Sequence, residues 1–411
     1  MGELYGLPEG WEWKKLGNIV KLQNGFAFKS KLFTNDGLPI VRIKNIKNEK
    51  VTLDDVVYFN PKDYSKNLDT YQIKKNDLLI AMSGATTGKI GLYDRKEESY
   101  LNQRVGLFRI ENFDLRSYLF YFLSTQIEKN LARSLGAAQP NLSTQQINDM
   151  SIPLPPLQEQ KRIVAKLDSL FAKIDQAITL HQQNMDEADA LMGSVLNEVF
   201  GELEGKYGMD ILSNSVDDPK KNIVDGPFGS NLKASEYIES GIPIIRLQNI
   251  QRFSFIDKDI KYVSEEKAKK LKRHSFVNGD IVITKLGDPL GKACIVPDFL
   301  KSGIIVADVI RVRPSIEKAL VSFIVYAVNS QLAIEQFSDS SKGATRQRVK
   351  LTMVRDLKVP IPPITIQQKT ITYLDKLSQK TKKLKQAQQE KMQSLKDLKA
   401  SLLDRAFRGE I

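Results

Sequence analysis

Cysteine and histidine are scarce in this chain of 411 residues, which contains one cysteine and two histidines. A single thiol cannot form an intramolecular disulfide, so the sequence predicts a fold held by its core and a reducing, cytoplasmic location. Cys294 lies in an apolar run typical of a strand, which favours a buried thiol over a nucleophile. No group of His, Cys, Asp and Glu has metal-ligand spacing, so we expect no metal site.

Long apolar runs and catalytic signatures are also missing. No stretch approaches the roughly 20 apolar residues of a membrane span, and Met1–Tyr5 lacks the features of a signal peptide. The chain has no G-x-G-x-x-G fingerprint and no Asn-Pro-Pro-Tyr or Asp-Pro-Pro-Tyr motif of base methylation. Gly84–Lys89 and Gly287–Lys292 resemble a phosphate loop but are one residue short, and no Ser or Thr follows either lysine. We therefore expect no catalytic residues and no cofactor in this chain.

What the sequence does contain is a long internal repeat. Ile152–Leu157 returns as Val359–Ile364, 207 residues later, and the same offset pairs Gln160 with Gln367. A period this long excludes a solenoid of short units, so each copy is a domain followed by a further element. Two copies in one chain predict pseudo-two-fold symmetry and two similar surfaces.

Each copy of the proline motif precedes a long helical pattern. Apolar residues alternate at spacings of three and four in 164–199 and, less regularly, in 374–402, as in coiled coils. The segment 152–204 has 4 basic and 9 acidic residues, whereas 359–411 has 11 and 5. Opposite charge favours an antiparallel helix pair, and the alternative is two separate amphipathic helices, each packed on its own domain. A continuous helix over 156–200 would span roughly 65 Å.

The blocks before the proline motifs alternate short β-rich runs with turn signals. Gly37–Arg42 matches Gly241–Arg246, and Asn45 matches Asn249, so the two blocks share a fold. We predict an α+β fold with two similar β-rich domains, each followed by a long helix. The predicted domains and helices, in chain order, are 1–151, 152–204, 205–358 and 359–411.

Both β-rich blocks carry excess positive charge. The net charge is +12, and the block 1–151 has 21 basic and 17 acidic residues, while 205–358 has 25 and 18. Basic globular blocks are typical of nucleic-acid binding. Polar loops in both blocks carry Asn, Gln, Arg and Asp side chains suited to base edges, and Lys suited to phosphates. The candidate DNA-binding residues are Lys44, Asn45, Thr86, Lys89, Asn102, Gln103, Arg104, Gln139, Asn141, Arg246, Gln248, Asn249, Lys285, Lys292, Asp308, Arg346, Gln347 and Arg348. The alternative for each is a surface turn, and for the two glycine-rich loops a hairpin turn with a solvated lysine.

Several motifs together resemble a known family. Leu7–Trp11 and Gly25–Phe28 look like the start of a target-recognition domain, and Ile152–Lys161 looks like the start of a spacer helix. With the repeat and the terminal Arg405–Gly409, the chain is similar to the specificity subunit of type I restriction-modification systems over essentially its whole length. The second block departs from this pattern, because it lacks the Leu-Pro-x-Gly-Trp entry and begins instead near Asp210.

The resemblance implies a non-catalytic subunit that recognises double-stranded DNA. Each domain would read one half of a bipartite, gapped sequence. The paired helices would fix the gap and dock two methyltransferase subunits and, through them, restriction subunits. S-adenosylmethionine, ATP and Mg²⁺ would belong to those partners. Three other interpretations stay open: an enzyme with an unrecognised site, a coiled-coil scaffold with incidental basic domains, and a silent subunit whose partners are missing.

Overall fold

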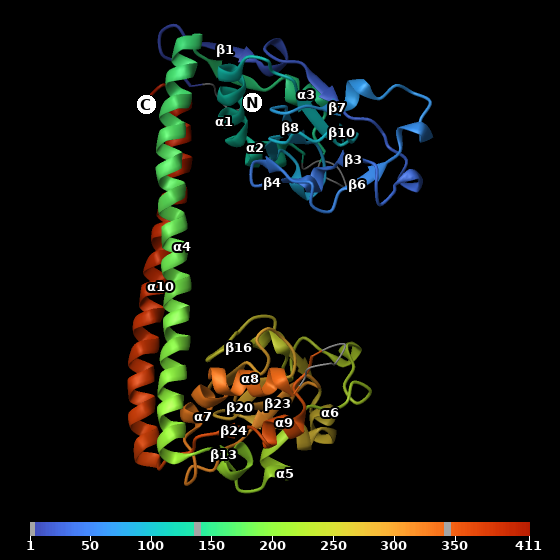
Figure 1. Cartoon of the computed structure of the whole chain (residues 1–411). Helices are drawn as coiled ribbons and strands as arrows, with labels where there is room; N and C mark the ends of the chain where they lie inside the picture. Colours follow the sequence, from blue (N-terminus) through green and yellow to red (C-terminus); the bar gives the residue numbers. More distant parts are fainter. Residues whose placement is uncertain (1–4, 135–140, 341–346) are drawn as a thin grey trace. The chain divides into compact units, whose positions relative to one another are not determined.

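The computed structural model describes residues 5–134, 141–340 and 347–411, which divide into two units (Figure 1). Unit one is Met1–His181 with Glu390–Ile411, and unit two is Gln182–Gln389. Each unit contains a β-rich domain and a portion of each of two long helices, α4 (Leu157–Tyr207) and α10 (Ile364–Phe407). In the described parts of the chain, no helix is both long and apolar enough to cross a membrane.

The β-rich domain of unit one has two main sheets. The first runs, in spatial order, β6 (Val57–Phe59), β3 (Leu38–Val41), β10 (Ser99–Leu101) and β7 (Gln72–Ile73). The second runs β2 (Leu22–Asn24), β11 (Val105–Phe108), β8 (Leu78–Ala81), β9 (Ile90–Leu92), β5 (Lys50–Val51) and β4 (Ile46–Lys47). β10 is parallel to β3, while β8 and β11 are antiparallel. A short antiparallel pair, β1 (Glu12–Lys15) and β12 (Ser151–Leu154), joins the two ends of the domain.

The domain of unit two has the same strand plan. One sheet runs β18 (Lys261–Val263), β15 (Ile242–Ile245), β22 (Ser302–Ile305) and β19 (Ser275–Val277). The other runs β14 (Ile223–Asp225), β23 (Val309–Val312), β20 (Ile281–Thr284) and β21 (Ala293–Ile295). The hairpin β16 (Ile250–Gln251) with β17 (Ser254–Phe255) and the terminal pair β13 (Asp210–Ile211) with β24 (Lys358–Val359) complete it. The parallel pair recurs as β22 with β15.

Short helices occupy matching positions in the two domains. Unit one has α1 (Phe113–Ser124), α2 (Ile127–Ser134) and α3 (Thr144–Asn148); unit two has α7 (Val321–Val328), α8 (Gln331–Asp339) and α9 (Leu351–Arg355), with the additional α5 (Pro219–Asn222) and α6 (Glu265–Lys270). The 3₁₀ turns are η1 (Leu16–Asn18), η2 (Ser30–Leu32), η3 (Ile43–Asn45), η4 (Pro61–Asp63), η5 (Asp69–Tyr71), η6 (Gly84–Thr86), η7 (Leu212–Ser215), η8 (Ala234–Glu236), η9 (Leu247–Asn249) and η10 (Lys272–His274).

The sequence repeat reflects a repeated contact at the start of each long helix. The amide nitrogen Nε2 of Gln160 donates to the main-chain oxygen of Pro155 at 2.9 Å, and that of Gln367 donates to Pro362 at 2.8 Å. Both glutamines are buried, so their amides need such partners. The conserved offset in sequence therefore preserves the same turn from proline motif to helix.

A second repeated contact fixes each helix to its own domain. The Tyr121 hydroxyl donates to Asp168, and the Tyr326 hydroxyl donates to Asp375 at 2.7 Å. Burial, with the neighbouring carboxylate, raises the pKa of both tyrosines well above the ordinary value. Both phenols therefore stay protonated as donors, and each links a domain helix to its long helix.

α4 and α10 are paired by charge as the sequence predicts. In unit one, Arg162 donates to the main-chain oxygen of the last residue, and Asp175 Oδ1 lies 2.9 Å from Lys399 Nζ. Residue numbers therefore rise along α4 while they fall along α10, which is antiparallel packing. In unit two, Asp189 Oδ2 lies 2.6 Å from Lys385 Nζ. These ion pairs are partly exposed and contribute little. Buried apolar side chains between α4 and α10 therefore supply most of the stability of the helix pair.

Cys294 is fully buried in β21, where burial raises the pKa of its thiol to about 12. A thiolate is the reactive form of cysteine, so this thiol is inert in the folded protein. The prediction of a buried thiol is confirmed.

Candidate nucleic-acid interface

Three strand ends and one loop meet at one edge of the unit-one domain. This edge, called rim one, consists of Arg42–Asn45, Met82–Thr86, Asn102–Arg104 and Asn141–Leu142, and the first three of these follow β3, β8 and β10. The Asn102 N–H donates to the Val41 oxygen at 3.1 Å and the Met82 N–H to the Arg104 oxygen at 3.0 Å. The Leu142 N–H then donates to the Met82 oxygen at 2.7 Å. These main-chain hydrogen bonds hold the loops in a fixed arrangement.

The same hydrogen bonds recur in unit two. Rim two consists of Arg246–Asn249, Lys285, Val306–Asp308 and Arg348–Val349. The Val306 N–H donates to the Ile245 oxygen at 3.1 Å, the Lys285 N–H to Asp308 at 2.8 Å, and the Val349 N–H to Lys285 at 2.8 Å. The two rims therefore share one backbone frame, in which Asn102 corresponds to Val306 and Arg104 to Asp308.

The side chains on this shared frame differ. Rim one presents Asn102, Gln103 and Arg104 at the positions where rim two has Val306, Ala307 and Asp308. Lys44, Gln103, Arg104 and Asn141 are exposed on rim one, whereas Asn102 is half-buried. Thr86 is less available, because its hydroxyl oxygen is buried and has no hydrogen-bond partner among the described residues. Rim one thus gathers side chains able to donate to phosphates and base edges.

Asn45 and Asn249, both candidate DNA contacts in the sequence, lie inside their loops. Each is completely buried. The Asn45 side chain accepts from the Arg42 N–H at 2.9 Å and donates to the Asp54 oxygen at 2.9 Å. Buried amides with local partners shape the backbone, and these two side chains lie inside the loops after β3 and β15 rather than at their surfaces.

In unit two, three other candidate residues, Lys285, Asp308 and Arg348, are engaged in ion pairs. Lys285 is 7% exposed at its side chain, and its Nζ lies 2.9 Å from Asp225 Oδ2. Asp308 Oδ1 lies 2.5 Å from an Arg348 guanidinium nitrogen. A carboxylate occupied by arginine has less capacity to accept from a cytosine amino group, so this pair must open or act together in any contact. Gln347 beside it is exposed.

The first glycine-rich loop, residues 84–89, follows the hairpin interpretation more closely than the phosphate-cradle one. The N–H groups of residues 87–89 donate to main-chain oxygens within residues 81–86, so they are not free for a phosphate. Positive φ angles at Gly84 and Gly88, of 75° and 83°, explain the glycines. Lys89 is exposed, so its side chain is the part of this loop able to meet DNA, whereas Lys292 in the second loop is half-buried.

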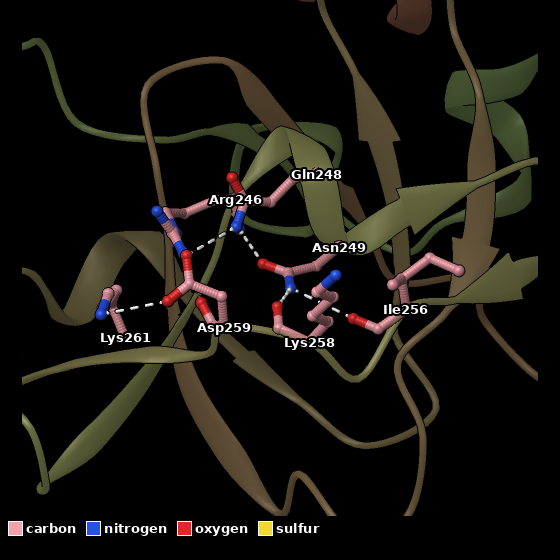
Figure 2. Close-up of polar contacts among 7 residues, drawn as sticks. All are labelled: Arg246, Gln248, Asn249, Ile256, Lys258, Asp259 and Lys261. Carbon is pink, nitrogen blue, oxygen red and sulfur yellow. Dashed lines mark hydrogen bonds and ion pairs between the residues drawn. The ribbon is translucent and has the colours of Figure 1, made fainter. Parts of the chain in front are cut away.

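In unit two, Arg246 and Gln248 of the rim contact the carboxylate of Asp259 (Figure 2). Asp259 Oδ2 accepts from an Arg246 guanidinium nitrogen at 2.9 Å and from Gln248 Nε2 at 3.1 Å, and Oδ1 lies 3.0 Å from Lys261 Nζ. These hydrogen bonds, from Arg246 first and then Lys261 and Gln248, hold the pKa of Asp259 far below its usual range. Asn249 braces the loop beneath by donating to the main-chain oxygens of residues 256 and 258 at 3.1 Å.

Two features next to rim two were not among the candidate residues. Phe228 is 81% exposed, and it follows Gly226, where an added Cβ would lie 1.9 Å from the Val306 oxygen. Basic residues of α6 and η10 form the second feature: Lys269, Lys272 and Arg273 are exposed there. η10 ends at His274, whose Nδ1 lies 2.6 Å from the Asp225 oxygen. The run of basic residues was visible in the sequence, but its position beside rim two was not.

The candidates Gln139 and Arg346 lie outside the described residues. Among the residues that are described, no group of three or more His, Cys, Asp and Glu is arranged to hold a metal ion.

Comparison with known proteins gives the family. The model for the type I restriction modification DNA specificity domain matches residues 8–183 and 229–393. The chain belongs to this family. Its function is accordingly DNA sequence recognition in a type I restriction-modification system, and it is the recognition component rather than the catalytic one.

Full-length relatives and a solved structure support the assignment. The EcoKI specificity subunit of Escherichia coli (strain K12) is 26% identical over 425 residues, covering 98% of this chain and 90% of the relative. The EcoBI specificity subunit of Escherichia coli is 24% identical over 430 residues, covering 99% and 88%. One solved structure concerns complex assembly and conformational transition of the type I R-M system. Its matching chain has a TM-score of 0.70 and is 21% identical, covering 99% of this chain and 100% of that one. The last likeness shows the fold of this specificity family.

Proposed function

We propose that rim one and rim two read the two halves of one bipartite, gapped sequence in double-stranded DNA. The observation that carries this proposal is the shared backbone frame with different side chains. Arg104 on rim one and Asp308 on rim two occupy the same position with opposite charge. A guanidinium donates to guanine, whereas a carboxylate accepts from cytosine. Two rims that differ in this way select different bases at the matching position.

The exposed rim side chains are the proposed contacts. On rim one these are Lys44, Gln103, Arg104 and Asn141, and on rim two Gln248, with Gln347 beside this rim. Lys89 and Lys292, together with the basic residues of η10, are proposed to meet phosphates, which position a protein on DNA without specifying sequence.

We further propose that residues 1–151 and 205–358 act as target-recognition domains, and 152–204 and 359–411 as spacer helices. These helices set the gap between the half-sites and dock two methyltransferase subunits, through which restriction subunits assemble. Exposed apolar side chains on the helices support a docking role; they include Leu180, Leu191, Tyr373, Leu384 and Leu398. S-adenosylmethionine, ATP and Mg²⁺ then bind to those partners in the cytoplasm.

The decisive experiment is a genome-wide map of methylated adenines in the host, with and without this gene. Loss of methylation at one two-part, gapped motif is the expected result, and it would reveal both half-sites. Unchanged methylation would contradict an active specificity subunit. Methylation or cleavage of DNA by the purified chain alone would favour an enzyme instead.

The role of the helices is tested by lengthening them. Insertion of seven residues into both α4 and α10 adds roughly 10 Å of helix, about three base pairs of DNA. The methylated motif should then have a longer gap and unchanged half-sites. Insertion into α4 alone is the control, since it breaks the antiparallel register and should abolish methylation. An altered half-site in the double insertion would count against separate reading and spacing.

A further inference from the structure

The loop after β15 carries two polar side chains of rim two, Arg246 and Gln248. The carboxylate of Asp259 accepts hydrogen bonds from both of them. Asp259 has a φ of 54°, a left-handed conformation that Asp and Asn tolerate better than most residues. This turn brings its carboxylate against Arg246 and Gln248 from the far end of the loop, while Lys261 on β18 holds the other oxygen (Figure 2). The carboxylate therefore has fixed donors on both sides.

An ionised carboxylate only accepts hydrogen bonds, and this property orients the Gln248 amide. The nitrogen of the amide must face Asp259, at 3.1 Å, so the oxygen Oε1 must face the opposite way (Figure 2). Gln248 is exposed, and among the described residues its Oε1 has no hydrogen-bond partner. The exposed end of the amide is therefore an acceptor.

Arg246 supports this arrangement without being available itself. Its side chain is only 20% exposed, and it donates both to the carboxylate of Asp259 and to the main-chain oxygen of the same residue. Lys261 is 33% exposed at its side chain. Both cations are thus paired with the single negative charge of Asp259, and both stabilise it.

Unit one lacks the same device. The matching loop has Lys44 in place of Gln248 and Val57 in place of Lys261. Among the described residues, Arg42 reaches the main-chain oxygen of Asp55, at 3.3 Å, rather than its carboxylate. Asp55 also has a positive φ, of 54°, so the turn is shared while the carboxylate clamp belongs to unit two.

We propose that Asp259 is a specificity-determining positioning residue, which turns the Gln248 amide so that Oε1 accepts from the exocyclic amino group of adenine or cytosine. This inference rests on the proposed reading of DNA by rim two. Guanine and thymine present carbonyl oxygens at the corresponding places in the major groove, and an amide oxygen held outward repels them. A freely rotating amide would accept either kind of base.

The test is selection of binding sites from a randomised duplex library by the full-length chain assembled with its methyltransferase subunits. The variant Asp259→Asn keeps the size and the positive φ of the native residue but offers an amide that can both donate and accept. We expect preference for the amino-bearing base at one position of one half-site to fall about tenfold. All other positions, and the gap, should be unchanged. Gln248→Ala should remove the same preference, and adding Asp259→Asn to it should change nothing more.

Controls separate this inference from a structural effect and from the proposed function. Asp55→Asn is the matched control and should leave the selected sequence unchanged. Because the pKa of Asp259 is held far below its usual range, the native preference should be constant between about pH 5 and pH 9. An unchanged base preference in Asp259→Asn, with the native motif present, would overturn this inference alone. Failure of the native complex to select any two-part motif would overturn the proposed function as well.

Discussion

Replacement of Asn249 by alanine tests whether this buried amide braces rim two or touches DNA. The native side chain accepts from the Arg246 N–H at 3.1 Å and donates to the main-chain oxygens of Ile256 and Lys258, both at 3.1 Å. Each net hydrogen bond is worth about 1 kcal/mol, so loss of all three should destabilise the loop by about 3 kcal/mol. The side chain is completely buried, so solvent cannot replace these partners in the folded loop.

Hydrogen exchange measured by mass spectrometry localises this effect. About 3 kcal/mol corresponds to a loss of protection of roughly a hundredfold in peptides covering residues 246–261. The control is Gln248→Ala, one position earlier and exposed, which should leave protection unchanged within about twofold. If Asn249→Ala kept native protection but lost discrimination at a base pair, the bracing role would be refuted. Direct contact between Asn249 and DNA would then be the supported interpretation.

Three further predictions concern other parts of the chain. Gly25→Ala should destabilise unit one by about 1–3 kcal/mol in urea unfolding, because the new Cβ would lie 2.1 Å from the main-chain oxygen of Asn102. Gly193→Ala on α4 should instead stabilise the chain by about 0.5–1 kcal/mol, because nothing lies within 4 Å of the new Cβ. Cys294, with its pKa raised to about 12, should be alkylated at pH 8 at least about a hundredfold more slowly in the folded chain than in urea. As pH rises, the Cys294 thiol ionises in the unfolded chain before it ionises in the folded one. The contribution of the buried, neutral thiol to the free energy of unfolding should therefore be lost as pH rises above about 8.5. The double change Lys272→Glu with Arg273→Glu should make DNA affinity less sensitive to salt. The negative slope of log affinity against log salt should become shallower by about 2, with base preference unchanged. An unchanged slope would place η10 away from DNA.

The repeat and the helices were predictable because they depend on local pattern. A heptad seam and opposite net charges specify an antiparallel pair without knowledge of the domains, and the ion pair of Asp175 with Lys399 realises that charge pattern. The boundary between α7 and α8, which are separated at Asn329, does not depend on local pattern in this way. The buried Asn329 side chain bonds the main chain of Ala293 on the neighbouring strand, a tertiary contact that periodicity does not contain.

The availability of individual rim residues could not be predicted in this way. Asn45 and Gln103 are both polar residues in polar loops, yet one is completely buried and the other is exposed. The difference arises from the main-chain oxygen of Asp54, nine residues further along, which the Asn45 amide meets. Pairing of Lys285 with Asp225 across sixty residues is likewise a product of strand packing. Sequence identifies polar loops, but only packing determines which of their side chains face outward.

The two rims show how one fold can carry two different sets of side chains. Main-chain hydrogen bonds at Met82 and Lys285 fix the loops in the same way, although one side chain is apolar and the other charged. Because the frame depends on backbone groups, rim side chains are free to change without loss of the fold. Substitutions at the rims should therefore alter base preference, whereas changes in α4 and α10 should alter the gap. That separation of roles follows from placing chemistry on side chains and geometry on the main chain and helices.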